Sequence, residues 1–446
     1  MAAETLKVEI IHKETIKPSS STPHQLRTHK LCLIDQFTPV MYVPLLLFYP
    51  NNDLGDNGVP DDHSEKTQKL KKTLSETLTH FYPLAGRIRN SDSIECNDNG
   101  VEFVEAKINF PLTKILEKPD AQFLRQFLAV VPESKEEASR GPLLVVQATF
   151  FQCGATAIGI SFLHKVMDIA SLTIFIRSWS AITLGLDQIV VPEFSAASLL
   201  PPADFSNCLE PPVVEMVQGK CRTRRLVFDA SKISALQCKA ASESVKNPTR
   251  VEAVSAFLWK SAMEASSSPS SSSKGNYPSR HSLFYQTVNI RPRTNPPLPE
   301  NLVGNLLEIF PAKTDNRSGS DLKDLVAKLR KGMEEVKENY AKGIDVEEIK
   351  KALEGFGSQL VENNYETDEY SFSSWCRFPF YEIDFGWGKP IWVSSCSMGF
   401  KNFIVLMDSR DGDGIEAWLI LEEKDMEFVE RNQELLAFAA LDPSVI

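Results

Sequence analysis

Strand-like and helix-like segments are intermixed along the whole chain, and this mixture most limits the possible fold. Residues 143–151 and 155–162 are two apolar runs typical of buried strands, and residues 152–154 supply a hairpin turn between them. After Asp168 the pattern changes to that of a helix. Because strands and helices do not alternate strictly in either half, the sequence predicts an α/β fold with mixed sheets rather than one doubly wound sheet.

Two or three domains are expected, because 446 residues exceed what one ordinary core holds. The periodicity fades between residues 196 and 220, where four prolines gather: Pro201, Pro202, Pro211 and Pro212. We therefore predict an N-terminal domain of residues 1–195, a linker of residues 196–220 and a C-terminal domain of residues 221–446.

Other periodic segments predict further elements. A half-buried strand is expected from residue 6 on, and Pro18 ends it; further strands are expected over residues 403–407 and 415–421. Helices are expected over residues 70–81, 251–263, 322–340 and 424–439. Ser320 is the expected cap of the helix over 322–340. Residues 224–240 predict a strand followed by a helix that Asp229 or Ser231 caps. The low-complexity stretch of residues 266–275, SSSPSSSSKG, is expected to form a mobile surface loop.

Net charge, apolar runs and cysteine spacing indicate which binding partners and which cellular compartment are expected. The formal net charge of -11 opposes non-specific binding to nucleic acid, although a local basic patch for phosphates remains possible. The N-terminus has charges where a signal peptide needs apolar residues, and the apolar run of residues 40–49 contains Pro44 and is too short to span a bilayer. The eight cysteines form no C-x-x-C pair, which indicates free thiols. We expect a cytoplasmic protein with no nucleic acid, membrane or metal as partner.

His164 differs from the other six histidines by its position. It directly follows an apolar strand, in GISFLHKVMD, where the chain turns into a helix, and such corners deliver side chains into a cleft. An imidazole with a pKa of about 6.5 is mostly neutral in the cytosol and can take a proton from a hydroxyl. The alternative is a histidine satisfied by local hydrogen bonds, and the residues alone leave both interpretations open.

Asp168 follows His164 by four residues, so a continuous helix would put both on one face as an acid–base pair. The alternative, which we favour, is that Asp168 caps the next helix or pairs with a distant cation. The chain has no G-x-S-x-G elbow, no phosphate-binding G-x-x-x-x-G-K-[ST] loop and no G-x-G-x-x-G fingerprint.

Two motifs together carry a family resemblance. Residues 164–168 form an HxxxD motif, and residues 384–388 form a DFGWG motif that Lys389 and Pro390 follow. At this spacing and chain length they resemble the BAHD family of plant acyl-CoA-dependent acyltransferases. Shorter matches extend over nearly the whole chain, among them YPLAGR at 82–87, VNIRPR at 288–293 and PPLPENLVGN at 296–305. The stretch of residues 373–390 is similar to the subgroup of alkaloid O-acetyltransferases.

The resemblance implies two chloramphenicol-acetyltransferase-like domains with a channel between them, in which His164 is the general base. Asp168 would point away from the substrate, pair with Arg291 and orient the histidine loop, and Asn289 would face the channel. The motif residues Asp384, Phe385, Gly386, Trp387 and Gly388 would serve the architecture and the coenzyme A side. An acyl-CoA, expected to be acetyl-CoA, would be a co-substrate rather than a permanently bound cofactor.

The leading hypothesis is a monomeric enzyme that transfers an acetyl group directly to a hydroxyl of a plant specialised metabolite, with an alkaloid as the expected acceptor. One alternative keeps the fold but uses a hydroxycinnamoyl or benzoyl donor, or an amine acceptor. Another is a non-catalytic binding protein on the same scaffold. A peptide-synthetase condensation domain is disfavoured, because such domains usually carry a second histidine where this chain has Leu163.

Overall fold

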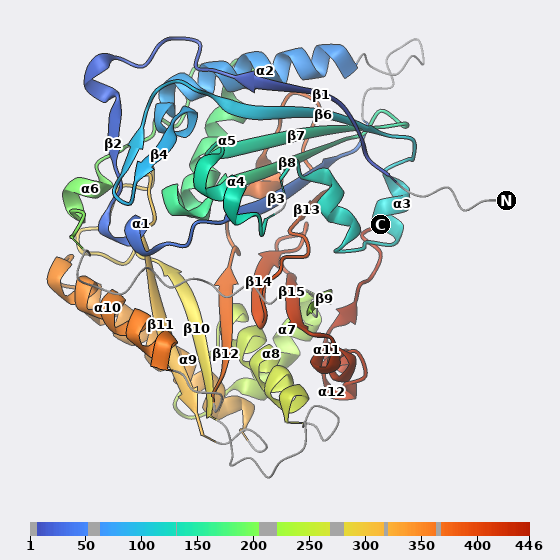
Figure 1. Ribbon diagram of the computed structural model, residues 1–446. Coiled ribbons are helices and arrows are strands. Elements are labelled where there is room, and N and C mark those ends of the chain that lie inside the picture. The colour runs from blue at the N-terminus through green and yellow to red at the C-terminus, as the bar shows by residue number, and fades with distance from the viewer. Residues whose placement is uncertain are drawn as a thin grey trace.

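The computed structural model describes residues 7–51, 63–130, 132–204, 221–267, 281–315, 320–362 and 367–446. Two large sheets dominate, one in the upper and one in the lower half of Figure 1, and each contains parallel and antiparallel strand pairs. This confirms the expected α/β class with mixed sheets.

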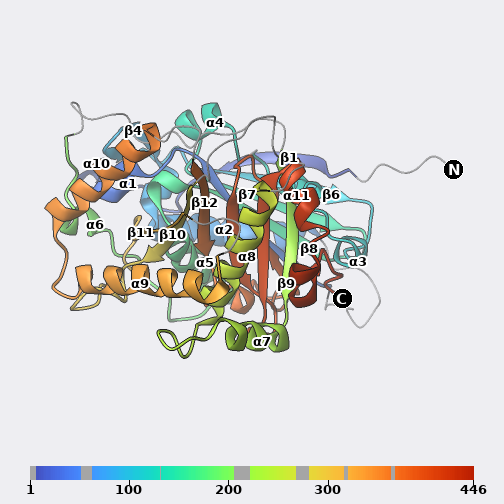
Figure 2. The same cartoon turned by 90° about the horizontal axis from the view of Figure 1, so that it is seen from below.

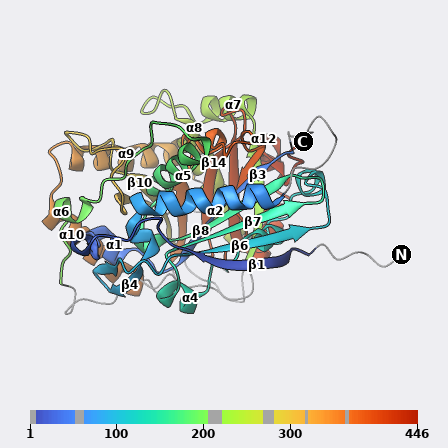
Figure 3. The same cartoon turned by 90° about the horizontal axis from the view of Figure 1, so that it is seen from above.

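The first sheet has six strands, in the order β1 (Glu9–Ile16), β6 (Val101–Ile108), β7 (Leu144–Phe151), β8 (Thr156–Leu163), β3 (Tyr42–Tyr49) and β13 (Trp392–Ser394). Its central strands β7, β8 and β3 are buried along their full length, which explains their continuous apolar runs. The helices α2 (His63–His80) and α5 (Ile169–Leu184) lie against each other over these strands, as the view from above in Figure 3 shows.

The second sheet has seven strands, in the order β11 (Leu307–Thr314), β10 (His281–Asn289), β12 (Thr367–Ser374), β14 (Phe403–Asp408), β15 (Ile415–Glu422), β9 (Cys221–Phe228) and β16 (Ala440–Leu441). Its helices lie on the near side in the view from below in Figure 2: α7 (Ala230–Ala240), α8 (Arg250–Ser266), α9 (Leu322–Tyr340) and α11 (Glu423–Val429). Asp229 caps α7 as expected, since its side chain accepts from the backbone N–H of Lys232.

The remaining elements are short or peripheral. A three-stranded sheet contains β2 (Thr28–Lys30), β5 (Ser93–Glu95) and β4 (Arg87–Asn90). The other helices are α1 (Leu33–Phe37), α3 (Thr113–Glu117), α4 (Lys135–Arg140), α6 (Ala196–Leu199), α10 (Val346–Glu362) and α12 (Gln433–Phe438). Five 3₁₀ turns complete the described part: η1 (His24–Leu26), η2 (Tyr82–Ala85), η3 (Phe123–Phe127), η4 (His164–Val166) and η5 (Phe380–Glu382).

The buried apolar residues form two clusters, one around each large sheet, and the first cluster also includes Val405 and Trp418 of the second sheet. Leu33 and Ile34 of α1 pack into the core of the second sheet. In the opposite direction, Phe385 and Trp392 belong to the core of the first sheet, where β13 also pairs with β3. The division into residues 1–195, 196–220 and 221–446 stays a prediction, and most of the predicted linker lies outside the described residues.

Two local predictions were wrong. The helix over 322–340 is capped by Asp321 rather than Ser320, because the Ser320 hydroxyl lies 3.2 Å from Thr314 Oγ1 instead. The helix expected over 424–439 is two helices, α11 and α12, because Asn432 accepts from the N–H of Leu435 and starts a new helix.

The expectations for the low-complexity stretch, the cysteines and membrane-spanning segments can be checked only over the described residues. Most of the low-complexity stretch, from residue 268 on, lies outside them. Seven of the eight cysteines lie within them, and these seven are free thiols. Within the same residues, every helix is too short or too polar to span a bilayer.

Candidate active site

His164 is held in place through its backbone. It opens η4 directly after β8, whose last residue Leu163 pairs with Tyr42 of β3. Its N–H donates to the carbonyl oxygen of Met41 at 2.8 Å, and its own carbonyl oxygen accepts from Asn305 Nδ2 at 2.7 Å. The first bond comes from the residue directly before β3 and the second from the loop that precedes β11, so both halves of the molecule fix this residue.

The His164 side chain is half-buried, and its environment favours the neutral imidazole. Burial lowers its pKa below the ordinary value, against smaller opposing effects of its own carbonyl group, Asp168, the backbone of Met167 and the side chain of Asn305. A neutral imidazole near neutral pH has an unprotonated ring nitrogen, which is what a general base requires.

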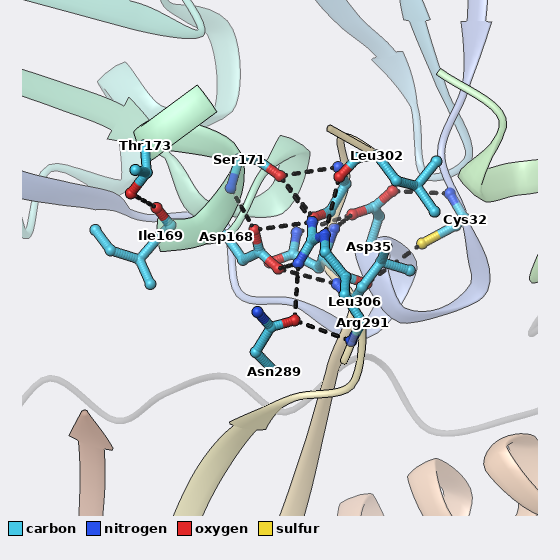
Figure 4. Close-up of polar contacts among 12 residues, drawn as sticks. Cys32, Asp35, Asp168, Ile169, Ser171, Thr173, Asn289, Arg291, Leu302 and Leu306 are labelled. Carbon is cyan, nitrogen blue, oxygen red and sulfur yellow. Dashed lines mark hydrogen bonds and ion pairs between the residues drawn. The ribbon is translucent and has the colours of Figure 1, made fainter. Parts of the chain in front are cut away.

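Asp168 and Arg291 form a buried ion pair, shown in Figure 4. Arg291 Nη1 lies 2.7 Å from Asp168 Oδ2, and the two residues are 2% and 1% exposed. Asp168 is also the N-cap of α5, where Oδ1 accepts from the N–H of Ser171 at 2.8 Å. Burial alone would raise the pKa of Asp168, but Arg291 and the hydrogen bonds from Ser171 and Leu306 hold it below the usual value.

The Arg291 guanidinium is saturated by acceptors. Besides Asp168, it donates to the carbonyl oxygens of Leu302 and Gly304 at 3.0 and 3.1 Å and to Ser171 Oγ at 3.1 Å. Asn289 lies beside it, since Asn289 Oδ1 accepts from Arg291 Nη1 at 3.2 Å and from the Arg291 N–H at 3.1 Å. The structure therefore brings three of the residues expected from sequence together, and Asn289 directs its oxygen to Arg291.

A second buried cluster beside His164 was missed from sequence. Asp35 of α1 accepts at Oδ1 from the N–H and from Nδ2 of Asn305, at 2.7 and 2.8 Å, and burial raises its pKa to about 6. Lys165, inside the HxxxD motif, is buried and donates to the carbonyl oxygens of Asp35 and Gln36 at 3.2 and 3.0 Å. Two sequence signals existed: a lone acid in the apolar stretch around Asp35, and Asn305 at the end of a family-like segment.

The DFGWG residues lie in a loop against α5, where Ser180 Oγ donates to the carbonyl oxygen of Asp384 and accepts from its N–H. Among the described residues, no hydrogen bond joins a side chain of this motif to His164. Asp384 Oδ1 accepts from the N–H groups of Gly386 and Gly388 at 2.7 and 3.0 Å, and both glycines have a positive φ, of 101° and 99°. Only glycine adopts such angles without strain, so the turn depends on both. Phe385 and Trp387 are buried, and their rings stack with centroids 5.9 Å apart.

This loop reaches the histidine indirectly, through neighbouring strands. It leads into β13, whose Trp392 and Val393 pair with Phe48 and Leu47 of β3. Strand β3 in turn pairs with β8, which ends immediately before His164. The motif therefore supports the edge of the sheet that carries the candidate base.

A cavity of about 1060 Å³ lies elsewhere, between α3 and β9, and residues such as Lys114, Phe123, Arg224 and Asp442 line it. His164 is not among its lining residues. The channel past His164 that the resemblance implies therefore stays a prediction.

The whole chain is similar in sequence and in fold to known transferases. A model of the Transferase family matches residues 6–436. Vinorine synthase from Rauvolfia serpentina is 38% identical over 429 residues, which cover 94% of this chain and 95% of that protein. Its crystal structure superposes with a TM-score of 0.84 at 35% identity, over 99% of this chain and 100% of the other.

Two further relatives carry names that describe acetyl transfer. Stemmadenine O-acetyltransferase from Catharanthus roseus is 36% identical over 428 residues, 94% of this chain and 95% of that protein. Limonoid 1-O-acetyltransferase from Citrus sinensis is 34% identical over 460 residues, 99% of this chain and 100% of that protein.

Proposed function

The chain belongs to the Transferase family of BAHD acyl-CoA-dependent acyltransferases, and on that premise we propose that it transfers an acetyl group to a hydroxyl of a plant alkaloid with His164 as general base. The observation that carries this proposal is the half-buried imidazole of His164, directly after β8. Burial lowers its pKa, and hydrogen bonds from both halves of the molecule fix the His164 backbone.

The reaction needs one base and no acyl-enzyme. His164 takes the proton of the acceptor hydroxyl while its oxygen attacks the carbonyl carbon of the thioester. The tetrahedral intermediate then collapses, the carbon–sulfur bond breaks, and the coenzyme A thiolate takes up the proton from the imidazolium. General base catalysis contributes about 10²–10⁴-fold in rate, and the positioning of both substrates must supply the rest.

Asp168 has a positioning role in this proposal. Its carboxylate is occupied by Arg291, Ser171 and Leu306, so it is not free to exchange protons with a substrate. It fixes the start of α5 and thereby the turn that carries His164. Asn289 is proposed to line the acceptor side through its amide nitrogen, and the DFGWG residues are proposed to shape the coenzyme A side.

The acetyl donor and alkaloid acceptor are supported by similarity to stemmadenine O-acetyltransferase and by the subgroup-like stretch of residues 373–390. A second acceptor class is a limonoid, which the likeness to limonoid 1-O-acetyltransferase favours. We also propose that the chain acts as a monomer in the cytoplasm, which size-exclusion chromatography and microscopy of a fluorescently tagged chain would test.

The test is thiol release by the purified protein with acetyl-CoA and a panel of alkaloid and limonoid alcohols, with product masses read by mass spectrometry. We expect acceptor-dependent release and a product heavier by one acetyl group. Parallel reactions with hydroxycinnamoyl-CoA, benzoyl-CoA and amine acceptors separate the alternative transferases. Release with none of these pairs would contradict the proposal and favour a non-catalytic binding protein.

A further inference from the structure

Two buried polar atoms next to the proposed base have no hydrogen-bond partner in the part of the chain that the structure describes: His164 Nδ1 and Asn305 Oδ1. A ring nitrogen of neutral histidine can donate one hydrogen bond, and a carboxamide oxygen can only accept. The two atoms are therefore complementary. The two atoms form no hydrogen bond with each other in this structure, but their residues are adjacent, because Asn305 Nδ2 donates to the His164 carbonyl oxygen at 2.7 Å. Since buried polar atoms of folded proteins are nearly always paired, each is the available partner for the other.

The orientation of the Asn305 amide follows from its other contacts. Its nitrogen lies 2.7 Å from the carbonyl oxygen of His164 and 2.8 Å from Asp35 Oδ1, and both of these atoms are acceptors. The nitrogen must therefore occupy that end of the amide, because a carboxamide oxygen there would face two other oxygens. The remaining end, Oδ1, is left for a donor. Asn305 is completely buried, so bulk water does not supply that donor.

Asp168 cannot fill this role, although it lies in the same motif. Its Oδ1 accepts from the Ser171 N–H and Arg291 Nη2, and its Oδ2 accepts from Arg291 Nη1 and the Leu306 N–H. These four bonds use the acceptor capacity of a carboxylate. The side chain that orients the ring must come from elsewhere. Besides the backbone groups of His164 and Met167, the Asn305 side chain is the group that acts on the ring, and it belongs to the cluster around Asp35.

We propose that Asn305 is the positioning residue of His164: Asn305 Oδ1 accepts from Nδ1–H of the ring, which leaves Nε2 unprotonated to act as the base, while Asp35 holds the amide in this orientation. The inference rests on the proposed function, because it explains how the orientation and tautomer of the proposed base, His164, are set. The carboxylate of Asp35 acts on the imidazole through an amide rather than directly. In this way the ring is oriented without a negative charge beside it.

The electrostatics agree with this arrangement. Burial is the largest influence and lowers the His164 pKa, and the Asn305 side chain is among the groups that raise it again. An acceptor at Nδ1 has this effect because it stabilises the imidazolium more than the neutral ring. Removing the amide should lower the pKa further, whereas merely opening the site to water should raise it toward about 6.5.

The kinetic test compares Asn305→Ala and Asn305→Asp with Asn301→Ala, a control in the same loop whose amide donates to the carbonyl oxygen of Val191. We expect Asn305→Ala to lower kcat about 10²-fold and to move the acidic limb of kcat/KM to lower pH. Asn305→Asp should move that limb to higher pH, and Asn301→Ala should leave it in place. A limb that moves to higher pH in Asn305→Ala would overturn the proposal.

A second measurement needs no substrate and no variant of Asn305. Protein labelled with ¹⁵N-histidine reports by NMR which ring nitrogen carries the proton, and the signal absent from His164→Gln identifies His164. We expect Nδ1–H in the unmodified protein above the His164 pKa. Nε2–H would overturn the inference even if acyl transfer is observed, whereas Nδ1–H in a protein without transferase activity would leave the inference standing and remove the proposed function.

Discussion

At the scale of single residues, the Asp168–Arg291 pair joins the two halves of the molecule next to the candidate base. Asp168 starts α5 on the first half, and Arg291 reaches it from the loop after β10. Breaking a buried ion pair by neutralising one partner is costly, because the other charge is left without compensation. The pair should therefore matter first for stability and only then for rate.

Asp168→Asn tests this directly, because asparagine is as good an N-cap as aspartate and only the charge is lost. We expect the free energy of unfolding to fall by about 3–5 kcal/mol, measured by urea denaturation. The matched control is Asp229→Asn, which changes the exposed N-cap of α7 and should cost little. Equal stability losses in the two variants would show that the buried pair contributes nothing beyond the cap.

The same pair predicts a difference at acid pH. Because the folded pKa of Asp168 lies below its unfolded value of about 3.9, its contribution is complete above that pH and disappears as the pH falls through the folded pKa. The loss of stability on acidification should therefore be smaller in Asp168→Asn than in the unmodified protein. Urea denaturation between pH 2 and pH 6 measures the difference.

At the scale of elements, periodicity predicted the buried strands and most of the long helices well, because apolar runs and stripes follow directly from burial. The N-terminal strand, expected to be half-buried, is β1, which is exposed except at Ile16. The strands β7 and β8 and the helices α5, α8 and α9 lie where their patterns indicated. The break between α11 and α12 was missed, because it depends on a single side chain, Asn432, which caps the start of α12. The Asp35–Asn305 contact was also beyond prediction, since it joins residues 270 positions apart.

The DFGWG loop illustrates how an element can support the site from a distance. Trp387 packs edge-on against Tyr49 of β3, with ring centroids 6.2 Å apart. We expect Trp387→Ala to destabilise the fold by about 3–5 kcal/mol, because a large buried ring is lost. Below its melting temperature the variant should keep a kcat within a few-fold of normal.

Trp387→Phe is the control, since it keeps an aromatic ring in the same position and should retain most of the stability. Calorimetry and steady-state kinetics on all three proteins separate the two effects. A variant that melts normally but has lost most of its kcat would contradict an architectural role for this residue.

At the scale of the whole molecule, the sheets are connected by a buried cluster around Trp392. This residue lies in β13 of the first sheet, and its Nε1 donates to Glu416 Oε2 of β15 in the second sheet at 3.2 Å. Arg225 of β9 pairs with the same oxygen at 3.0 Å and stacks over the Trp392 ring at 5.3 Å. The two sheets should therefore unfold together.

We expect one cooperative unfolding transition, and a loss of about 3–5 kcal/mol in Glu416→Gln, because Arg225 would remain buried without its partner. The control is Glu430→Gln, whose carboxylate pairs with Arg222 and Arg224 in a more exposed position. That change should cost about 1 kcal/mol or less. Two separated transitions, monitored by fluorescence and circular dichroism, would show instead that the halves unfold independently.

The central claim is that the neutral ring of His164 removes the proton from the acceptor hydroxyl. Single-turnover kinetics of His164→Ala, with the acceptor that the alcohol panel identifies, test this claim most directly. His281→Ala is the control, because His281 lies at the start of β10 and pairs with Asp315. We predict a rate about 10²–10⁴-fold lower for His164→Ala with an unchanged melting temperature, and a normal rate for His281→Ala. Equal rates in both variants and the unmodified protein would contradict the account.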